Sequence, residues 1–137
     1  GVCGWTDPDN RRTYPWGFED FELIEYHRYL IDLHKKLPAL RRGSLKQLLA
    51  DRQLIVYGRM SGENKCAVII NNRGESRSVR VPVWELGITD EDAITRMMLS
   101  DEKGYNAGRI DYRADHGWLT LDVPAHSGVL LSSGALV

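Results

Sequence analysis

The hydrophobic repeat of this chain changes once, near Gly43, and that change restricts the folds open to it. Before Gly43, apolar residues recur at spacings of three and four, which is the repeat of one helix face. After Gly43, apolar and polar residues alternate in short runs between turn-forming segments, as they do in half-buried strands. A chain of 137 residues in this order has room for one β-rich domain and an appended helix.

The helical repeat lies in EDFELIEYHRYLIDLHKKLPAL, and we assign a helix to residues 19–37. Lys35 and Lys36 near its end complement the helix dipole, and Pro38 ends it. Its apolar stripe consists of Leu23, Tyr26, Leu30, Leu33 and Leu37, widened by Phe21, Ile24 and Ile31. We expect more than half of this helix to be covered, either by the β-rich region or by another domain upstream.

Six runs after Gly43 have the composition of strands: residues 54–60, 65–71, 78–84, 93–99, 118–123 and 127–132. In the third run Val79, Val81 and Val83 should face inward, which puts Pro82 on the outer register of an edge strand or bulge. The continuous apolar run CAVII predicts a central strand. Glycine-containing turns favour antiparallel neighbours, so six to eight short strands predict a mainly β fold, an antiparallel β-sandwich.

The charge and the hydrophobicity of the chain exclude some classes of function. A net charge of -1 gives no electrostatic attraction to nucleic acid or to an anionic membrane. No apolar run reaches the length of a transmembrane helix, and no leader sequence is visible. We expect Cys3 and Cys66 to be reduced thiols rather than a disulfide, although the sequence leaves both open. No spacing of ligand residues predicts a metal, and no motif predicts a cofactor.

The segment DPDNRRTYPW, residues 7–16, combines charge with aromatic rings and two prolines. Asp7 followed by Pro8 suits the first two positions of a type I turn. Carboxylates accept hydrogen bonds from neighbouring hydroxyls, and a guanidinium donates them with fixed geometry. The loop is therefore suited to a polyhydroxylated ligand, while mutual pairing of its own charges is the structural alternative.

Two motifs together carry a resemblance to a known family. DPDNRR with its aromatic residues is followed by LPALRRG, by strands containing VYGR and AVIINN, and by LDVPAHSGVLL. This order resembles the C-terminal portion of alpha-amylase family enzymes (glycoside hydrolase family 13), above all the neopullulanase, cyclomaltodextrinase and maltogenic amylase group. The resemblance implies that residues 1–43 end a (β/α)8 barrel, with its last loop at 1–18 and last helix at 19–37. Residues 44–137 would form the C-terminal all-β domain.

The resemblance also implies a division of function. The parent enzyme would hydrolyse alpha-1,4 bonds of maltooligosaccharides, cyclodextrins or pullulan with retention, and alpha-1,6 bonds remain an open question. In the family the catalytic carboxylates precede this region, so we assign no catalytic residue here and expect the isolated chain to be inactive. Its partners would be the missing upstream barrel and the sugar substrate. A cytoplasmic location is expected, as for many members of this group.

Matching the family loop position by position implies that Asp7 and Arg11 hold sugar hydroxyls, and Trp5 is a candidate for stacking on a sugar ring. Asp9 and Arg12 are assigned to stiffening the turn, and Trp16 to packing. The four histidines, His27, His34, His116 and His126, are assigned structural or solvent-exposed positions. A surface sugar site built from Tyr105, Tyr112 and Trp118 is a further, less favoured possibility.

Two other readings remain open. The chain could be an independent carbohydrate-binding β-sandwich, which tight sugar binding by the isolated chain would support. The parent could instead be an alpha-glucosidase or a transglycosylating enzyme, because activity within a fold changes easily. In the absence of a barrel, the apolar helix stripe should dock elsewhere or mediate self-association.

Overall fold

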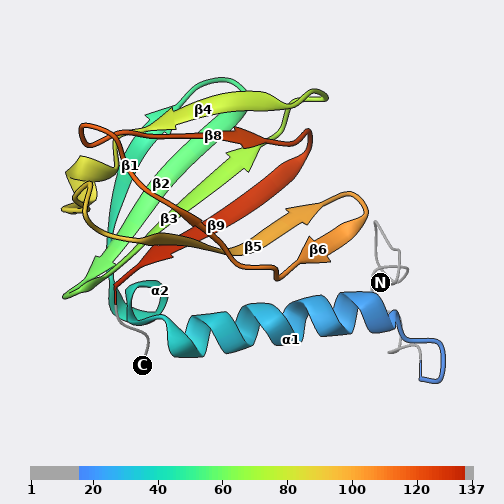
Figure 1. Cartoon of the computed structure of the whole chain (residues 1–137). Coiled ribbons are helices and arrows are strands. Elements are labelled where there is room, and N and C mark those ends of the chain that lie inside the picture. Colours follow the sequence, from blue (N-terminus) through green and yellow to red (C-terminus); the bar gives the residue numbers. More distant parts are fainter. Residues whose placement is uncertain (1–15, 135–137) are drawn as a thin grey trace.

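The computed structural model describes residues 16–134 and has three layers (Figure 1). Helix α1 (Phe21–Lys36) lies along one face of a seven-stranded sheet, and a two-stranded sheet covers the opposite face. The two sheets enclose one hydrophobic core, and the helix and the large sheet enclose a second. The predicted mainly β, antiparallel fold is confirmed.

Helix α1 begins and ends where local chemistry dictates. Its N-cap is Asp20, whose carboxylate accepts the backbone N–H of Leu23 at 3.0 Å. Lys36 pairs with Asp32 one turn earlier at 2.8 Å. Pro38 does end α1, but it also starts a second short helix, α2 (Pro38–Arg42), because its missing N–H costs nothing at a first helical position.

The large sheet has the order β1-β2-β3-β9-β5-β6, with β7 also paired to β5. All its paired strands are antiparallel, and β3 is central, as the sequence predicted. The bounds are β1 (Ser44–Ala50), β2 (Leu54–Ser61), β3 (Asn64–Asn71), β5 (Ile94–Asp101), β6 (Gly104–Asn106), β7 (Ile110–Tyr112) and β9 (Ser127–Ser133). The small sheet pairs β4 (Arg77–Val81) with β8 (Leu119–Val123).

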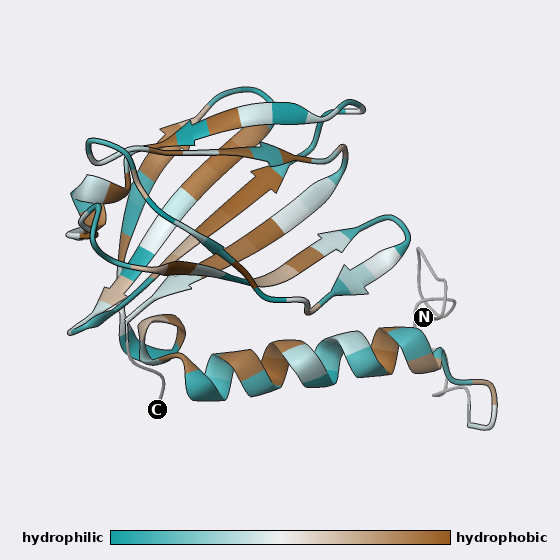
Figure 2. Cartoon of the chain, viewed as in Figure 1, coloured by the Kyte–Doolittle hydropathy of each residue, from teal (hydrophilic) through white to brown (hydrophobic). Residues whose placement is uncertain are grey.

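The alternating pattern of the small sheet fills the core between the sheets. Val79 and Val81 of β4 are 2% and 0% exposed and face Leu121 and Leu119 of β8 across the ladder. From the large sheet, β2 and β3 contribute Val56 and Ile69 to the same core. Figure 2 shows this arrangement as hydrophobic segments on the strands that face one another.

The strand predicted at 78–84 is shorter than expected. It ends at Val81, and Pro82 is buried rather than on the outer register. Proline lacks the N–H that a ladder requires, so the chain leaves the sheet and enters the 3-10 helix η1 (Val83–Leu86). Val83 is nevertheless buried, as predicted. The sequence analysis also missed β1, β6 and β7, the last two of which have only three residues each.

The β-rich region covers part of the apolar stripe of α1. Leu33 and Leu37 are 1% and 0% exposed and share a core with Cys66, Met98 and Leu130 of the sheet. That cover is partial within this chain, and cover of the remaining helix surface by an upstream domain stays a prediction. Leu33 alone of the residues of α1 is fully buried. Several large apolar side chains at or near the helix stay exposed: Trp16, Phe18, Phe21, Leu23 and Ile31.

A tyrosine and a thiol lie at the contact between helix and sheet. The hydroxyl of Tyr29 donates to the backbone carbonyl of Met97 in β5. Burial raises the pKa of the Tyr29 hydroxyl, because the charged phenolate loses hydration. Cys66 is a free, buried thiol, and burial raises its pKa as well. Both groups are therefore kept protonated where the helix docks.

Within residues 16–134, neither α-helix combines the length and apolar character needed to cross a membrane. In the same range, no group of three or more His, Cys, Asp or Glu side chains is arranged to hold a metal ion.

Candidate docking face

The outer face of the large sheet is apolar beyond the part that α1 covers. Ile55 of β2 pairs with Ile70 of β3, and Tyr57 pairs with Val68 two residues along. Because neighbours two apart share a face, these four side chains lie together, opposite the core formed by Val56 and Ile69. Ile55 and Ile70 remain 48% and 42% exposed. We call this surface, together with the adjoining side of α1, the docking face.

A groove runs between α1 and these strands, with a cavity volume of about 430 Å³. The helical region contributes Tyr26, Leu30 and Leu40 to one wall, and Tyr57, Val68 and Ile70 form much of the other. Among its lining residues only Asp101 and His126 carry a carboxylate or an imidazole. The groove therefore presents mainly apolar surface, which an apolar partner surface can cover without desolvating many charges.

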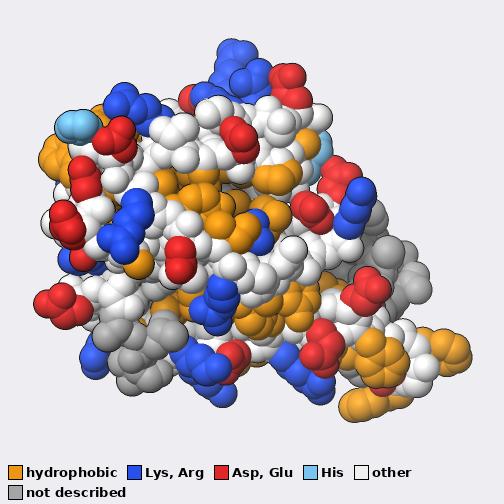
Figure 3. Space-filling view, in the orientation of Figure 1, with side chains coloured by type: hydrophobic (Ala, Val, Ile, Leu, Met, Phe, Trp, Pro, Cys, Tyr) orange, Lys and Arg blue, Asp and Glu red, His pale blue; other side chains and the backbone are white. Residues whose placement is uncertain are grey.

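The exposed apolar side of α1 adjoins this groove. Leu23 lies seven residues before Leu30 and so has nearly the same direction around the helix. Leu30 lines the groove, so Leu23 extends its wall toward the start of the helix. Ile31, 53% exposed, continues the apolar surface farther from the sheet. A different side of the helix carries charged side chains along its length, as Figure 3 shows.

A second, larger cavity of about 650 Å³ opens at the start of α1, beside the turn between β5 and β6. Tyr26 and Tyr105 line it, with ring centroids 5.5 Å apart, and Tyr105 also stacks on Tyr29 at 5.3 Å. Carboxylates surround these rings: Asp20, Glu22, Glu25, Asp101 and Glu102. Exposed apolar side chains also gather at this end of the helix in Figure 3.

The three sugar-contact residues predicted from sequence, Trp5, Asp7 and Arg11, lie outside the described residues and remain predictions. Trp16, assigned to packing in the core or at an interface, is 79% exposed, so it does not lie in the core of this chain, and interface packing stays a prediction. The reason lies in its position: it precedes α1 at the end of the helix where Phe18 and Phe21 are also exposed.

The surface site considered for Tyr105, Tyr112 and Trp118 does not form. Tyr105 packs against tyrosines of α1, whereas Tyr112 packs against the core between the sheets. Trp118 precedes β8, and the guanidinium of Arg80 lies 4.3 Å from its ring centroid. The sequence spacing of these rings could not reveal that they belong to different layers.

The histidines occupy structural or exposed positions, as expected. Nδ1 of His27 lies 2.8 Å from the carbonyl oxygen of Leu23 within α1, and the imidazole of His116 pairs with Asp115 in an exposed turn. Sequence reasoning missed the groove itself, although one signal was present. The run CAVII is apolar on both faces of its strand, and a strand covered on one face alone would alternate.

Comparison with known proteins identifies the relationship. No model of a known protein family matches the sequence. An amylopullulanase from Thermoanaerobacterium thermosulfurigenes is 29% identical over 147 residues, covering 97% of this chain and 7% of that protein. Neopullulanase 2 from Thermoactinomyces vulgaris is 36% identical over 91 residues, covering 64% of this chain and 16% of that protein. The chain is similar to one part of each of these two enzymes and to one part of a cyclomaltodextrinase.

The fold of the alpha-amylase family agrees with this relationship. An alpha-amylase structure from Geobacillus thermoleovorans matches with a TM-score of 0.79 at 22% identity, over 98% of this chain and 27% of that one. The resemblance inferred from the two sequence motifs is thereby confirmed. The present chain spans only 7% and 16% of the length of these two relatives.

Proposed function

We propose that this chain is the C-terminal part of an alpha-glucan hydrolase. Residues 1–43 would complete a (β/α)8 barrel with its last loop and helix, and residues 44–137 would form the following β domain. The observation that carries the proposal is the one-sided cover of α1. One side of the helix packs on its own sheet, while the adjoining side and the groove beside it present apolar surface that a barrel would cover.

We assign catalysis to residues upstream of this chain. A retaining glycoside hydrolase uses two carboxyl groups about 5 Å apart, one as acid/base and one as nucleophile. In the family, both lie on earlier barrel strands. The present chain supplies substrate contacts through Asp7 and Arg11, with stacking by Trp5, and stabilises the barrel from one side. Its substrates are maltooligosaccharides, cyclodextrins or pullulan, and its location is the cytoplasm.

The direct test joins the chain to the coding sequence upstream of Gly1. The longer protein and the 137-residue chain are each assayed on maltoheptaose and on pullulan, with the anomer of the first product followed by NMR. We expect retained-anomer hydrolysis by the longer protein and no hydrolysis by the shorter one. Activity in the 137-residue chain, or an upstream sequence without paired carboxylates, would contradict the proposal.

The loop is tested in the longer protein with Asp7→Ala and Arg11→Ala. Removing one charged partner of a sugar hydroxyl costs about 1.5–3 kcal/mol, so kcat/KM should fall roughly 10- to 150-fold. The matched control is Asp9→Ala in the same loop, which should change kcat/KM less than threefold or so if Asp9 only stiffens the turn. Equal losses in all three variants would assign Asp7 and Arg11 to the turn instead.

A free-standing sugar-binding module is the competing function. It would bind maltooligosaccharides with dissociation constants on the order of 1 μM without any barrel. Isothermal titration of the 137-residue chain distinguishes the two functions, because a rim loop without its barrel is not preorganised and should not reach that affinity.

A further inference from the structure

We propose that Trp84 forms a secondary site for an alpha-glucan chain on the β domain, with the indole plane as its floor. The sugar class rests on the proposed function, whereas the site itself rests on the geometry around η1. Trp84 is 55% exposed at the start of η1, at the corner where η1 meets the turn before β8. An exposed indole offers a flat apolar surface to the C–H face of a pyranose ring.

The indole is held in place by its backbone and by the residue beneath it. The N–H of Trp84 donates to the carbonyl oxygen of Gly117 at 3.0 Å. A Cβ at Gly117 would lie 2.9 Å from Cβ of Trp84 and 3.1 Å from its Cδ1, so the ring rests directly on a glycine. Gly117 has a φ of 86°, a conformation that side chains rarely adopt.

The turn under the ring is fixed from a second direction. The carboxylate of Asp90 accepts the N–H groups of His116 and Gly117 at 2.8 and 2.9 Å. His116 itself has a φ of 53°, in the left-handed region that non-glycine residues rarely occupy. The backbone hydrogen bond of Trp84, its contact with Gly117 and the bonds from Asp90 to the turn therefore position the exposed indole. A side chain that is already fixed loses less conformational entropy when it binds a ligand.

The turn that supports Trp84 through Gly117 also carries exposed hydrogen-bonding groups. The side chains of His116 and Asp115 are 92% and 90% exposed and lie 2.7 Å apart, so each keeps further polar atoms toward solvent. The guanidinium of Arg80 lies over the ring of Trp118, the residue that follows Gly117, so one face of that second indole is already covered. Imidazole and carboxylate groups can hydrogen-bond the hydroxyls of a pyranose, and an aromatic plane suits its C–H face.

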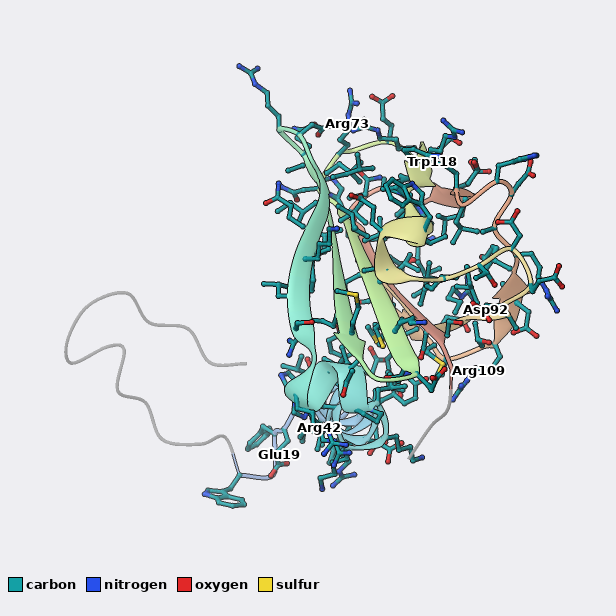
Figure 4. The ribbon with its side chains drawn as sticks, turned by 90° about the vertical axis from the view of Figure 1, so that its left-hand side faces the viewer. Glu19, Arg42, Arg73, Asp92, Arg109 and Trp118 are labelled. Carbon is teal, nitrogen blue, oxygen red and sulfur yellow. The ribbon has the colours of Figure 1, made fainter. Side chains whose placement is uncertain are left out.

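The site lies away from the docking face. In Figure 4 Trp118 stands at the end of the molecule opposite α1 and α2, beyond η1. A barrel seated on the docking face would therefore leave Trp84 accessible. A site at this distance would hold a long glucan on the enzyme rather than cleave it.

NMR of the 137-residue chain with ¹⁵N-labelled tryptophan tests this site. The four tryptophans give four indole N–H signals, assigned by single substitutions. Maltoheptaose is titrated to about 20 mM, a range that reveals millimolar dissociation constants. We expect a saturable shift of the Trp84 signal, and at least about a tenfold loss of affinity in Trp84→Ala, measured from the signals of Trp118 in the adjoining turn.

The controls separate the site from the proposed function. Trp16→Ala removes another exposed indole and should leave the affinity unchanged, whereas Gly117→Ala should weaken binding by displacing the ring. Thermal unfolding of each variant confirms that it is folded. A Trp84 signal that does not move, or an affinity equally reduced by Trp16→Ala, would overturn the site. A shift with cellohexaose but not with maltoheptaose would keep the site and contradict the alpha-glucan function.

Discussion

Asn64 is a single buried side chain that joins three segments of the chain. It is 2% exposed; its Oδ1 accepts the N–H of Ala39 in α2 at 3.0 Å. Its Nδ2 donates to the hydroxyl of Ser132 and to the carbonyl oxygen of Ser133, at 3.1 and 3.2 Å. The residue thus ties the short helix α2 to β3 and β9, where no water is available to replace a lost bond.

We predict that Asn64→Ala destabilises the chain by about 2–4 kcal/mol, because it leaves a buried N–H and a buried carbonyl without partners. The free energy of unfolding in urea measures this. The matched control is Asn72→Ala, an exposed asparagine one residue beyond β3, which should change stability by less than about 0.5 kcal/mol. Equal effects of the two changes would rule out the joining role of Asn64.

Gly43 ends the LPALRRG motif because the backbone leaves no room for a side chain there. A Cβ at this position would lie 2.8 Å from the carbonyl oxygen of Met60 and closer still to that of Ala39. Backbone atoms cannot move aside, so we predict that Gly43→Ala destabilises the chain by about 1–3 kcal/mol. Gly74→Ala is the control, since its nearest neighbour atom would be 3.6 Å away. A thermal midpoint that is unchanged in Gly43→Ala would disprove this reason for the glycine.

At the scale of elements, the contact of α1 with the sheet should depend on alkaline pH. Burial raises the pKa of Tyr29 above 10.0, and the protonated hydroxyl donates to Met97. A raised pKa means that this stabilisation is complete below the pKa of the unfolded state, about 10, and is lost as pH rises through the folded value. The raised pKa of Cys66 adds to the same trend at alkaline pH.

We therefore predict that stability decreases between pH 9 and 11 or so, and that Tyr29→Phe makes this decrease shallower. The measurement is urea unfolding followed by circular dichroism, in a Cys66→Ala background that removes the thiol. Tyr57→Phe removes another half-buried hydroxyl, one on the groove wall, and should keep the slope of the unmodified chain. A slope that Tyr29→Phe leaves unchanged would show that the hydroxyl does not support helix docking.

The accuracy of sequence reasoning varied among the elements for physical reasons. Helix α1 and strand β8 follow from periodicity, because each is long enough to show its repeat, and β3 and β9 follow from their short apolar runs. Strand β1 was missed because a register shift between Gln47 and Leu49 breaks the alternation on which the prediction depends. Strands of three residues show no repeat at all, so β6 and β7 could not be found.

The docking face was only partly predictable. The apolar stripe on α1 indicates how much of the helix surface should be buried, but the sequence does not indicate which element buries it. The structure divides that stripe: Leu33 packs on the sheet, while Leu23 and Ile31 stay exposed. Similarly, Trp84 shows no sequence signal as a sugar platform, because its support by Gly117 is a contact between distant segments.

For the whole molecule, we predict concentration-dependent self-association of the isolated chain through the docking face. Its exposed apolar side chains, among them Leu23, Ile31 and Ile70, favour burial against a second copy. Light scattering should show a rising mass with concentration, and the double change of Leu23→Lys and Ile31→Lys should lower it. Trp84→Lys, an equally exposed apolar residue elsewhere, serves as the control. A monomer at all concentrations would count against the docking face.

The position of β9 has a consequence for how the protein is made. It is the last strand among residues 16–134, yet it lies between β3 and β5 near the centre of the large sheet. During synthesis, the sheet cannot form completely until Ser127–Ser133 has left the ribosome, because β3 and β5 both pair with this segment. A message broken or stopped before this point would yield a chain with two open strand edges, which proteases and chaperones recognise. Such an interrupted chain is thus marked by the unpaired edges of β3 and β5.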